Sequence, residues 1–153
     1  MHNAIVVANS ILYRMWERKK DVRPMKLQKL LYYTAGFYYK EFKKDLLCET
    51  DNFYKWEYGP VEPDVYYDFA GYRYNPILKL QKGKLDDIYI VNQKADKEFY
   101  FVLDRVLDSY GDKGDIALSK MTHEHRAWKE PDINHLISKT LIRDTFENLD
   151  YGK

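Results

Sequence analysis

The sequence predicts a mainly α fold, a compact single-domain bundle of about six helices with a short β element near residues 53–57. The length of 153 residues suits one domain, which at this size buries roughly 70% of the surface of its unfolded chain. Apolar residues recur at helical spacing in several separate segments, and only one stretch alternates apolar and polar residues. No linker or internal repeat divides the chain, so we expect residues 1–153 to form one domain.

The first predicted helix covers residues 4–18, where apolar residues recur from Ile5 to Trp16. A second helix is predicted from Pro24, since proline suits a first turn whose N–H would have no helical partner. One side of this second helix is apolar and carries Leu27, Leu30, Leu31, Thr34 and Tyr38. Its other side is expected to be solvated and carries Lys26, Lys29 and Lys40.

Gly36 lies inside the second predicted helix, where glycine costs roughly 1 kcal/mol relative to alanine. We expect a close approach by another helix to require it.

The β element is predicted from alternation. Tyr54, Trp56 and Tyr58 alternate with Lys55 and Glu57, which indicates a short extended strand with the three aromatic residues on one side. Gly59-Pro60 is expected to stop this strand as a structural corner. A third helix is expected to open at residues 61–63 and to end near Asn75-Pro76.

The second half of the chain contains three further predicted helices. Residues 95–110 carry a strong apolar stripe that ends at Gly111. Asp115 is expected to cap a short helix through Met121, and Ser138 a closing helix, with Trp128 in the connection between them. Residues 77–94, with Leu85, Ile88, Ile90 and Val91, are compatible with a short strand or with an extended packed segment.

The expected core combines the apolar stripes of all these helices. Its central members should be Leu30, Leu31, Phe69, Leu103, Leu107 and Phe146.

Composition excludes several classes of protein. The single cysteine, Cys48, rules out an internal disulfide framework and a cysteine-based zinc cluster, and it favours a reducing compartment. No run of about 20 apolar residues exists, and the first residues lack the basic region of a secretory signal. We therefore expect a cytoplasmic protein with no membrane partner.

Charge is unevenly distributed although the net charge is only +1. Residues 1–46 contain ten Lys and Arg against four Asp and Glu, a net +6, and the remainder carries −5. The basic third could be a solvated surface, could attract the acidic remainder, or could bind an anionic partner such as nucleic acid. A pI near 7.7 argues against nucleic acid, which stays the alternative.

No catalytic, cofactor-binding or metal-binding residue is expected. His123-Glu124-His125 is the one cluster that suggests metal chemistry, but its i, i+2 spacing does not place both histidines on one helix face. We expect histidines bonded to the backbone near a helix end, with metal binding and catalysis as the alternatives. The chain has no glycine-rich phosphate loop and no ordered nucleophile and base.

The segment from Met25 to Tyr32, Met-Lys-Leu-Gln-Lys-Leu-Leu-Tyr, resembles the Panacea domain family. Further matches follow in the family's order. They are Trp56 to Val61 with Pro63, Val65-Tyr66 and Phe69, then Val106-Leu107 with Tyr110-Gly111, then Leu118 with Met121-Thr122-His123 and Trp128, and finally Ile137-Ser138 with Ile142 and Phe146. The family includes the proteolysis adaptor SocA and phage-associated GepA-like proteins.

This resemblance implies a non-catalytic antitoxin that neutralises a cognate protein toxin, encoded by a neighbouring gene, through direct contact. The adaptor member implies a second mode, in which the toxin is delivered to a protease. We expect the contact to include Tyr54, Trp56 and Tyr58 with the Gly59-Pro60 corner, because aromatic anchors dominate interface energies. Packing in the core or its rim is the alternative for these aromatic residues.

Overall fold

The computed structural model describes residues 1–83 and 86–153, and within them the predicted mainly α fold is confirmed. Seven α-helices and a two-stranded antiparallel sheet are found among these described residues. The elements in chain order are α1 (Ala4–Glu17), α2 (Pro24–Phe42), β1 (Tyr54–Trp56), β2 (Gly59–Val61), α3 (Pro63–Phe69), the 3-10 turn η1 (Ala70–Tyr72), α4 (Lys97–Tyr110), α5 (Asp115–His123), α6 (Arg126–Lys129) and α7 (Lys139–Glu147).

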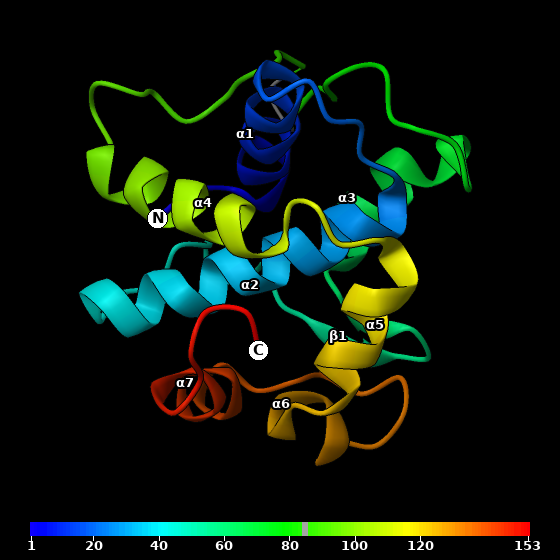
Figure 1. Cartoon of the computed structure of the whole chain (residues 1–153), viewed down its shortest axis with the longest axis vertical. Helices are drawn as coiled ribbons and strands as arrows, with labels where there is room; N and C mark the ends of the chain where they lie inside the picture. Colours follow the sequence, from blue (N-terminus) through cyan, green and yellow to red (C-terminus); the bar gives the residue numbers. More distant parts are fainter. Residues whose placement is uncertain (84–85) are drawn as a thin grey trace.

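Helix α2 is the centre of the molecule. It crosses the middle of the fold, with α1 and α4 on one side and α7 on the other, and it also contacts β2, α3 and α5 (Figure 1). Pro24 stands at its start as predicted, and Lys43 closes it in the left-handed conformation. Because neighbours surround α2, eleven of its nineteen residues are buried and they are not confined to one face.

The expected core is confirmed. Leu30, Leu31, Phe69, Leu103, Leu107 and Phe146 are all buried in one hydrophobic cluster. Aromatic rings fill much of it, including Tyr33 stacked on Tyr110 with ring centroids 3.9 Å apart. In the part of the chain that is described, no helix has both the length and the apolar character that crossing a membrane requires.

The β element is a hairpin, so the prediction that Gly59-Pro60 ends it as a corner is wrong: β1 already ends at Trp56, and Gly59 and Pro60 belong to a second strand. Glu57 and Tyr58 form the turn, and Gly59–Val61 returns as β2 with Pro60 opposite Lys55. Gly59 has φ of +125°, a conformation that residues with a side chain rarely adopt. Gly59 thus allows the backbone conformation at which the second strand begins. Pro60, which has no N–H to donate, is accommodated because β2 has only one neighbouring strand.

Two other boundaries differ from the predictions. Asp115 is the first residue of α5, and Gly114 takes the N-cap position without a side-chain bond. Trp128, expected in a connection, lies in the one-turn helix α6. The predicted N-cap of the last helix is confirmed, because Ser138 accepts a hydrogen bond from the N–H of Leu141.

The segment at residues 77–94 is extended and packed rather than a strand over its described residues. Val91 is buried, and its N–H donates to Ser10 Oγ at 2.8 Å. Asn9 bonds to both the N–H and the C=O of Gln81. The side chains of α1 therefore satisfy this backbone in place of a sheet. Leu85, which we assigned to this segment, lies outside the described residues.

Five of the ten basic residues of the first third form ion pairs with acidic residues later in the chain, which supports one of the three alternatives that this charge left open. Arg14 donates from Nε and Nη2 to the two carboxylate oxygens of Asp104, each at 2.8 Å. Arg18 bonds to Asp108 at 2.8 Å. Further ion pairs join Lys20 to Asp112, Lys43 to Glu147 and Lys44 to Glu98. These ion pairs thus connect the first two helices and the residues that flank them to later parts of the chain.

Gly36 permits the close approach that the sequence predicted. A Cβ atom at this position would lie 2.2 Å from Cε2 of Phe146, which enters from α7. The Phe146 ring is itself enclosed by Tyr32 and Phe37, with centroid distances of 5.2 and 5.0 Å. The ring therefore has little room to move away from an added methyl group.

We predict that Gly36→Ala destabilises the protein by about 1–3 kcal/mol, the usual cost of overpacking a core. Helix propensity alone would make the same change favourable by about 1 kcal/mol, so the sign of the effect is diagnostic. Urea unfolding measures it. Gly71→Ala is the matched control, because a Cβ at Gly71 meets nothing within 4 Å. Equal or greater stability of Gly36→Ala would contradict the close contact.

Candidate functional site

The backbone of the hairpin turn is held by side chains from the α5–α6 segment. Three consecutive carbonyls are used. Trp128 Nε1 donates to the C=O of Trp56 at 2.9 Å, and His123 Nε2 lies 2.9 Å from that of Glu57. Ser119 Oγ donates to the C=O of Tyr58 at 2.7 Å. The hairpin is thus anchored through groups that do not depend on its own side chains.

Helix α2 holds the other end of the hairpin. The amide of Gln28 makes two bonds to the backbone of Glu62, donating to its C=O at 3.1 Å and accepting from its N–H at 2.8 Å. The neighbouring Lys29 donates from Nζ to the C=O of Pro60 at 3.5 Å. Residues of the Met25–Tyr32 segment therefore position the residues that follow the turn.

Gly59 leaves the space that the Lys29 side chain occupies. A Cβ atom on Gly59 would lie 2.6 Å from Cε and 3.0 Å from Nζ of Lys29. Both the positive φ of Gly59 and this contact exclude a larger residue. The hairpin and the lysine are thus fitted to each other.

Lys29 is buried, so the prediction that it belongs to the solvated side of its helix is wrong. The residue is only 1% exposed, and none of the ion pairs found among the described residues involves it. Burial lowers the pKa of Lys29 to about 7, and the nearby carboxylate of Asp115 opposes this shift without cancelling it. Near neutral pH the amine therefore changes charge easily.

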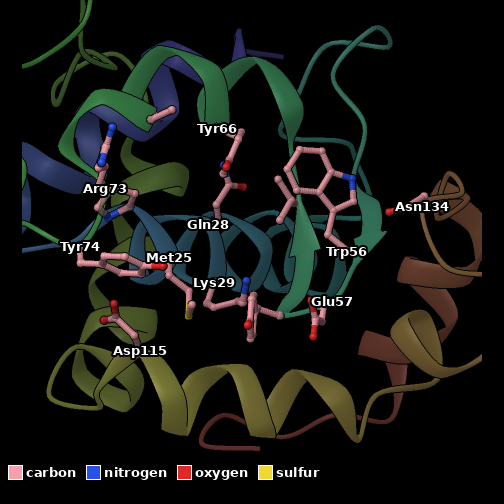
Figure 2. A pocket seen from close by; sticks show the side chains of 14 residues that line it. Met25, Gln28, Lys29, Trp56, Glu57, Tyr66, Arg73, Tyr74, Asp115 and Asn134 are labelled. Atoms are coloured by element: carbon pink, nitrogen blue, oxygen red, sulfur yellow. The ribbon is translucent and has the colours of Figure 1, made fainter.

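A cavity of about 610 Å³ lies beside this lysine, between the start of α2, the hairpin turn, α3 with η1, and the start of α5. We call it the hairpin cavity. Figure 2 shows Trp56 at one end and Tyr74 at the other, with Lys29 between them. Its volume falls within the range of sites that bind small molecules or a few side chains.

The hairpin cavity gathers part of the predicted contact residues. Trp56 and Tyr58 line it, and Trp56 packs edge-to-face on Tyr66 with ring centroids 4.8 Å apart. Tyr54 is half-buried and pairs through its backbone with Leu136, outside the cavity lining. Gly59 and Pro60 are buried beneath the turn.

The sequence did not predict that Lys29, Tyr66 and Tyr74 line one cavity. For Lys29 a signal existed, because the consecutive apolar residues 30–33 indicate a helix enclosed on all sides rather than one with a polar face. Tyr66 and Tyr74 are brought to the site by the fold, and no spacing in the sequence distinguishes them from other tyrosines.

The histidines of His123-Glu124-His125 bond to backbone carbonyls, as expected. His125 is buried, with Nδ1 2.9 Å from the hydroxyl of Tyr32 and Nε2 3.2 Å from the C=O of Lys153. Burial lowers the pKa of His125, which favours the neutral ring, whose Nε2–H can donate to Lys153 while Nδ1 accepts from Tyr32. His123 holds the hairpin turn, so the two rings serve separate structural contacts.

One group of carboxylates in the described ranges could approach a metal ion. Oxygens of Asp51, Glu62 and Asp64 lie within 4.8 Å of one another. Two of them already accept helix N–H groups: Asp51 bonds to Ala4 at the start of α1, and Glu62 bonds to Val65 at the start of α3. Helix capping accounts for their positions.

Comparison with known families gives one match. The profile of the family described as antitoxin SocA-like, Panacea domain, matches residues 27–129, about two thirds of the chain. The chain belongs to this family, and it therefore carries an antitoxin-like domain. The matched region includes α2 from Leu27 onward, the hairpin, α3 with η1, α5 and α6, which build most of the site. No curated protein and no solved structure matches the chain.

The buried amine leads to a prediction about stability and pH. Because the pKa of Lys29 is lowered from 10.5 to about 7, the unfolded chain binds a proton between these values that the folded chain lacks. The free energy of unfolding then rises with pH, by up to about 1.4 kcal/mol per unit. Below pH 7 both states are protonated and the full cost of burying the charge is present.

We therefore predict that Lys29→Met stabilises the protein most at pH 6.5, and that this advantage shrinks by several kcal/mol (about 1.4 per unit) towards pH 9.5. Urea unfolding at both pH values measures the difference. Lys120→Met is the control, because Lys120 is exposed on α5 and the same substitution removes no buried charge. A pH-independent effect of Lys29→Met would show that its amine is solvated in the folded protein.

Proposed function

We propose that this protein is an antitoxin that neutralises a cognate protein toxin by direct binding, without catalysis, and that the hairpin cavity and its aromatic edge form the contact surface. The observation that carries the proposal is the anchored hairpin: three consecutive turn carbonyls are fixed by α5 and α6 beside an open cavity. Membership of the antitoxin-like family supports a toxin as the partner in general.

The edge of the cavity has the composition of a binding surface. Tyr58 is 58% exposed, Tyr74 85% and Tyr66 39%, and all three line the cavity together with Trp56, which packs on Tyr66. Tyrosine and tryptophan offer large contact areas at little conformational cost and are enriched among the residues that dominate binding energy. Tyr54 precedes Trp56 by two residues and so shares its side of the strand, which keeps it at the border of the proposed surface.

We also propose that the whole chain, residues 1–153, acts as one antitoxin domain. The family match begins at residue 27 and ends at residue 129, but α1 and α7 both pack on α2. A truncation to the matched residues would expose the core of α2 on two sides. Nucleic acid stays the alternative, and the pairing of Arg14 and Arg18 of the basic third with carboxylates of α4 argues against it.

The test is rescue from toxicity. The product of the reading frame next to this one is expressed with the protein, and growth is followed. We predict that the unaltered chain restores growth, and that Tyr58→Ala loses rescue with an unchanged melting temperature because its side chain is exposed. Truncating an anchor of this kind costs about 2 kcal/mol or more of binding energy, roughly a thirtyfold loss of affinity.

Tyr54→Ala and Trp56→Ala extend the series. Lost rescue with the fold retained assigns either residue to the contact. Tyr13→Ala is the matched control, since Tyr13 is an exposed tyrosine on α1 and does not line the cavity. Toxin abundance is measured in parallel: neutralisation by binding leaves it unchanged, whereas delivery to a protease lowers it. Full rescue by both Trp56→Ala and Tyr58→Ala would exclude the proposed surface.

A further inference from the structure

We infer that the hairpin cavity receives an acidic side chain, Asp or Glu, of the partner protein, and that the Nζ atom of Lys29 pairs with its carboxylate. This inference rests on the proposed function and names the chemistry of its contact. It would make Lys29 the residue that selects an acidic anchor over a neutral one.

Lys29 forms no ion pair with any described residue, and the attraction of Asp115 does not offset the burial of its amine. A fully buried ammonium group is costly unless it is paired, because it loses its hydration. Lys29 has one hydrogen bond, to the C=O of Pro60 at the long distance of 3.5 Å. An ammonium group has three donors, so at least two find no protein acceptor among the described residues. A carboxylate in the cavity would supply both charge and acceptors.

The hairpin is shaped to leave room for the Lys29 side chain. The space for Cε and Nζ exists only because residue 59 is a glycine, and the strand beyond it presents the one acceptor. Met25 and Trp56 line the same cavity, so a partner residue would insert between apolar walls. In such surroundings an ion pair is weakly screened, and a neutral side chain of the same shape would leave the amine unpaired.

The other charges around the cavity are mixed, and the two acids among them oppose an incoming carboxylate while the one arginine favours it. Asp115 from α5 and Glu57 from the turn are negative, and Arg73 after η1 is positive. Asp115 already attracts the Lys29 proton, but burial still dominates and lowers the pKa of the amine. A carboxylate within hydrogen-bond distance would reverse this balance, so binding is coupled to uptake of a proton above pH 7.

The first experiment does not require the toxin. The full chain is labelled with carbon-13 at lysine Cε and titrated with two blocked dipeptides, Ac-Trp-Glu-NH2 and Ac-Trp-Gln-NH2, which differ in one carboxylate. We expect the glutamate peptide to move the Lys29 resonance and to raise its pKa by at least one unit, and the glutamine peptide to do neither. Lys29→Met identifies the resonance. Equal responses to both peptides, or none, would overturn the inference.

The second experiment uses the toxin of the rescue assay. Each acidic residue of the toxin is changed to its amide and combined with Lys29→Met or with the control Lys120→Met. We expect Lys29→Met to weaken binding at least tenfold, and one toxin variant to add no further loss in combination with it.

The outcomes separate the two proposals. If the unaltered chain does not rescue growth, the proposed function fails. If it rescues and Lys29→Met binds the toxin as tightly, the proposed function stands and the carboxylate contact is refuted. Independent, additive losses at Lys29 and at every toxin carboxylate would refute it as well, because a direct pair must be non-additive.

Discussion

The burial of α2 on nearly all sides is the constraint on which the rest of the structure depends. A helix with one buried face can leave its polar residues in water, but α2 must find partners for them inside the protein. Gln28 finds them in the backbone of Glu62, and Lys29 finds one in Pro60. These polar residues of the central helix therefore fix the position of the hairpin, and a core element and a surface element become parts of one arrangement.

The same constraint explains why segments far apart in the sequence belong together. Three segments that lie tens of residues apart in the sequence meet at the hairpin turn. They are Met25–Tyr32, Tyr58–Val61 and the stretch from Thr122 to Trp128. His123 and Trp128 fix carbonyls of the turn, and Thr122 lies against Gly59. These three segments thus mostly form the scaffold of the site. The exposed tyrosines around the cavity are a separate set, held in place by that scaffold.

The helices could be predicted from the sequence where the spacing of apolar residues agreed with the residues that typically begin or end a helix. Pro24 and Ser138 have the roles that their chemistry implied, because each acts through the backbone of its own helix end. Gly36 has its expected role as well, although the helix that approaches it, α7, could not be named from the sequence. Of the hairpin, only the first strand was predicted, from the alternation of apolar and polar residues. The second strand was missed, because Gly59-Pro60 is as typical of the end of a strand as of a short second strand. The cavity could not be predicted, since Lys29 and Tyr74 meet there through packing. The apolar residues 30–33 indicate that the helix is enclosed, but they do not say which elements enclose Lys29 or that a cavity lies beside it.

The carbonyl bonds to the turn have one more consequence. A backbone carbonyl is the same group whatever side chain its residue carries, so the bonds from Ser119, His123 and Trp128 would survive exchanges at positions 56, 57 and 58. Shape is specified by one set of residues and surface chemistry by another. Random substitution can then explore new surface chemistries on an unchanged frame, at little risk to folding. Such a division of labour is what allows a small domain to diversify in what it recognises, as loops on a rigid framework do.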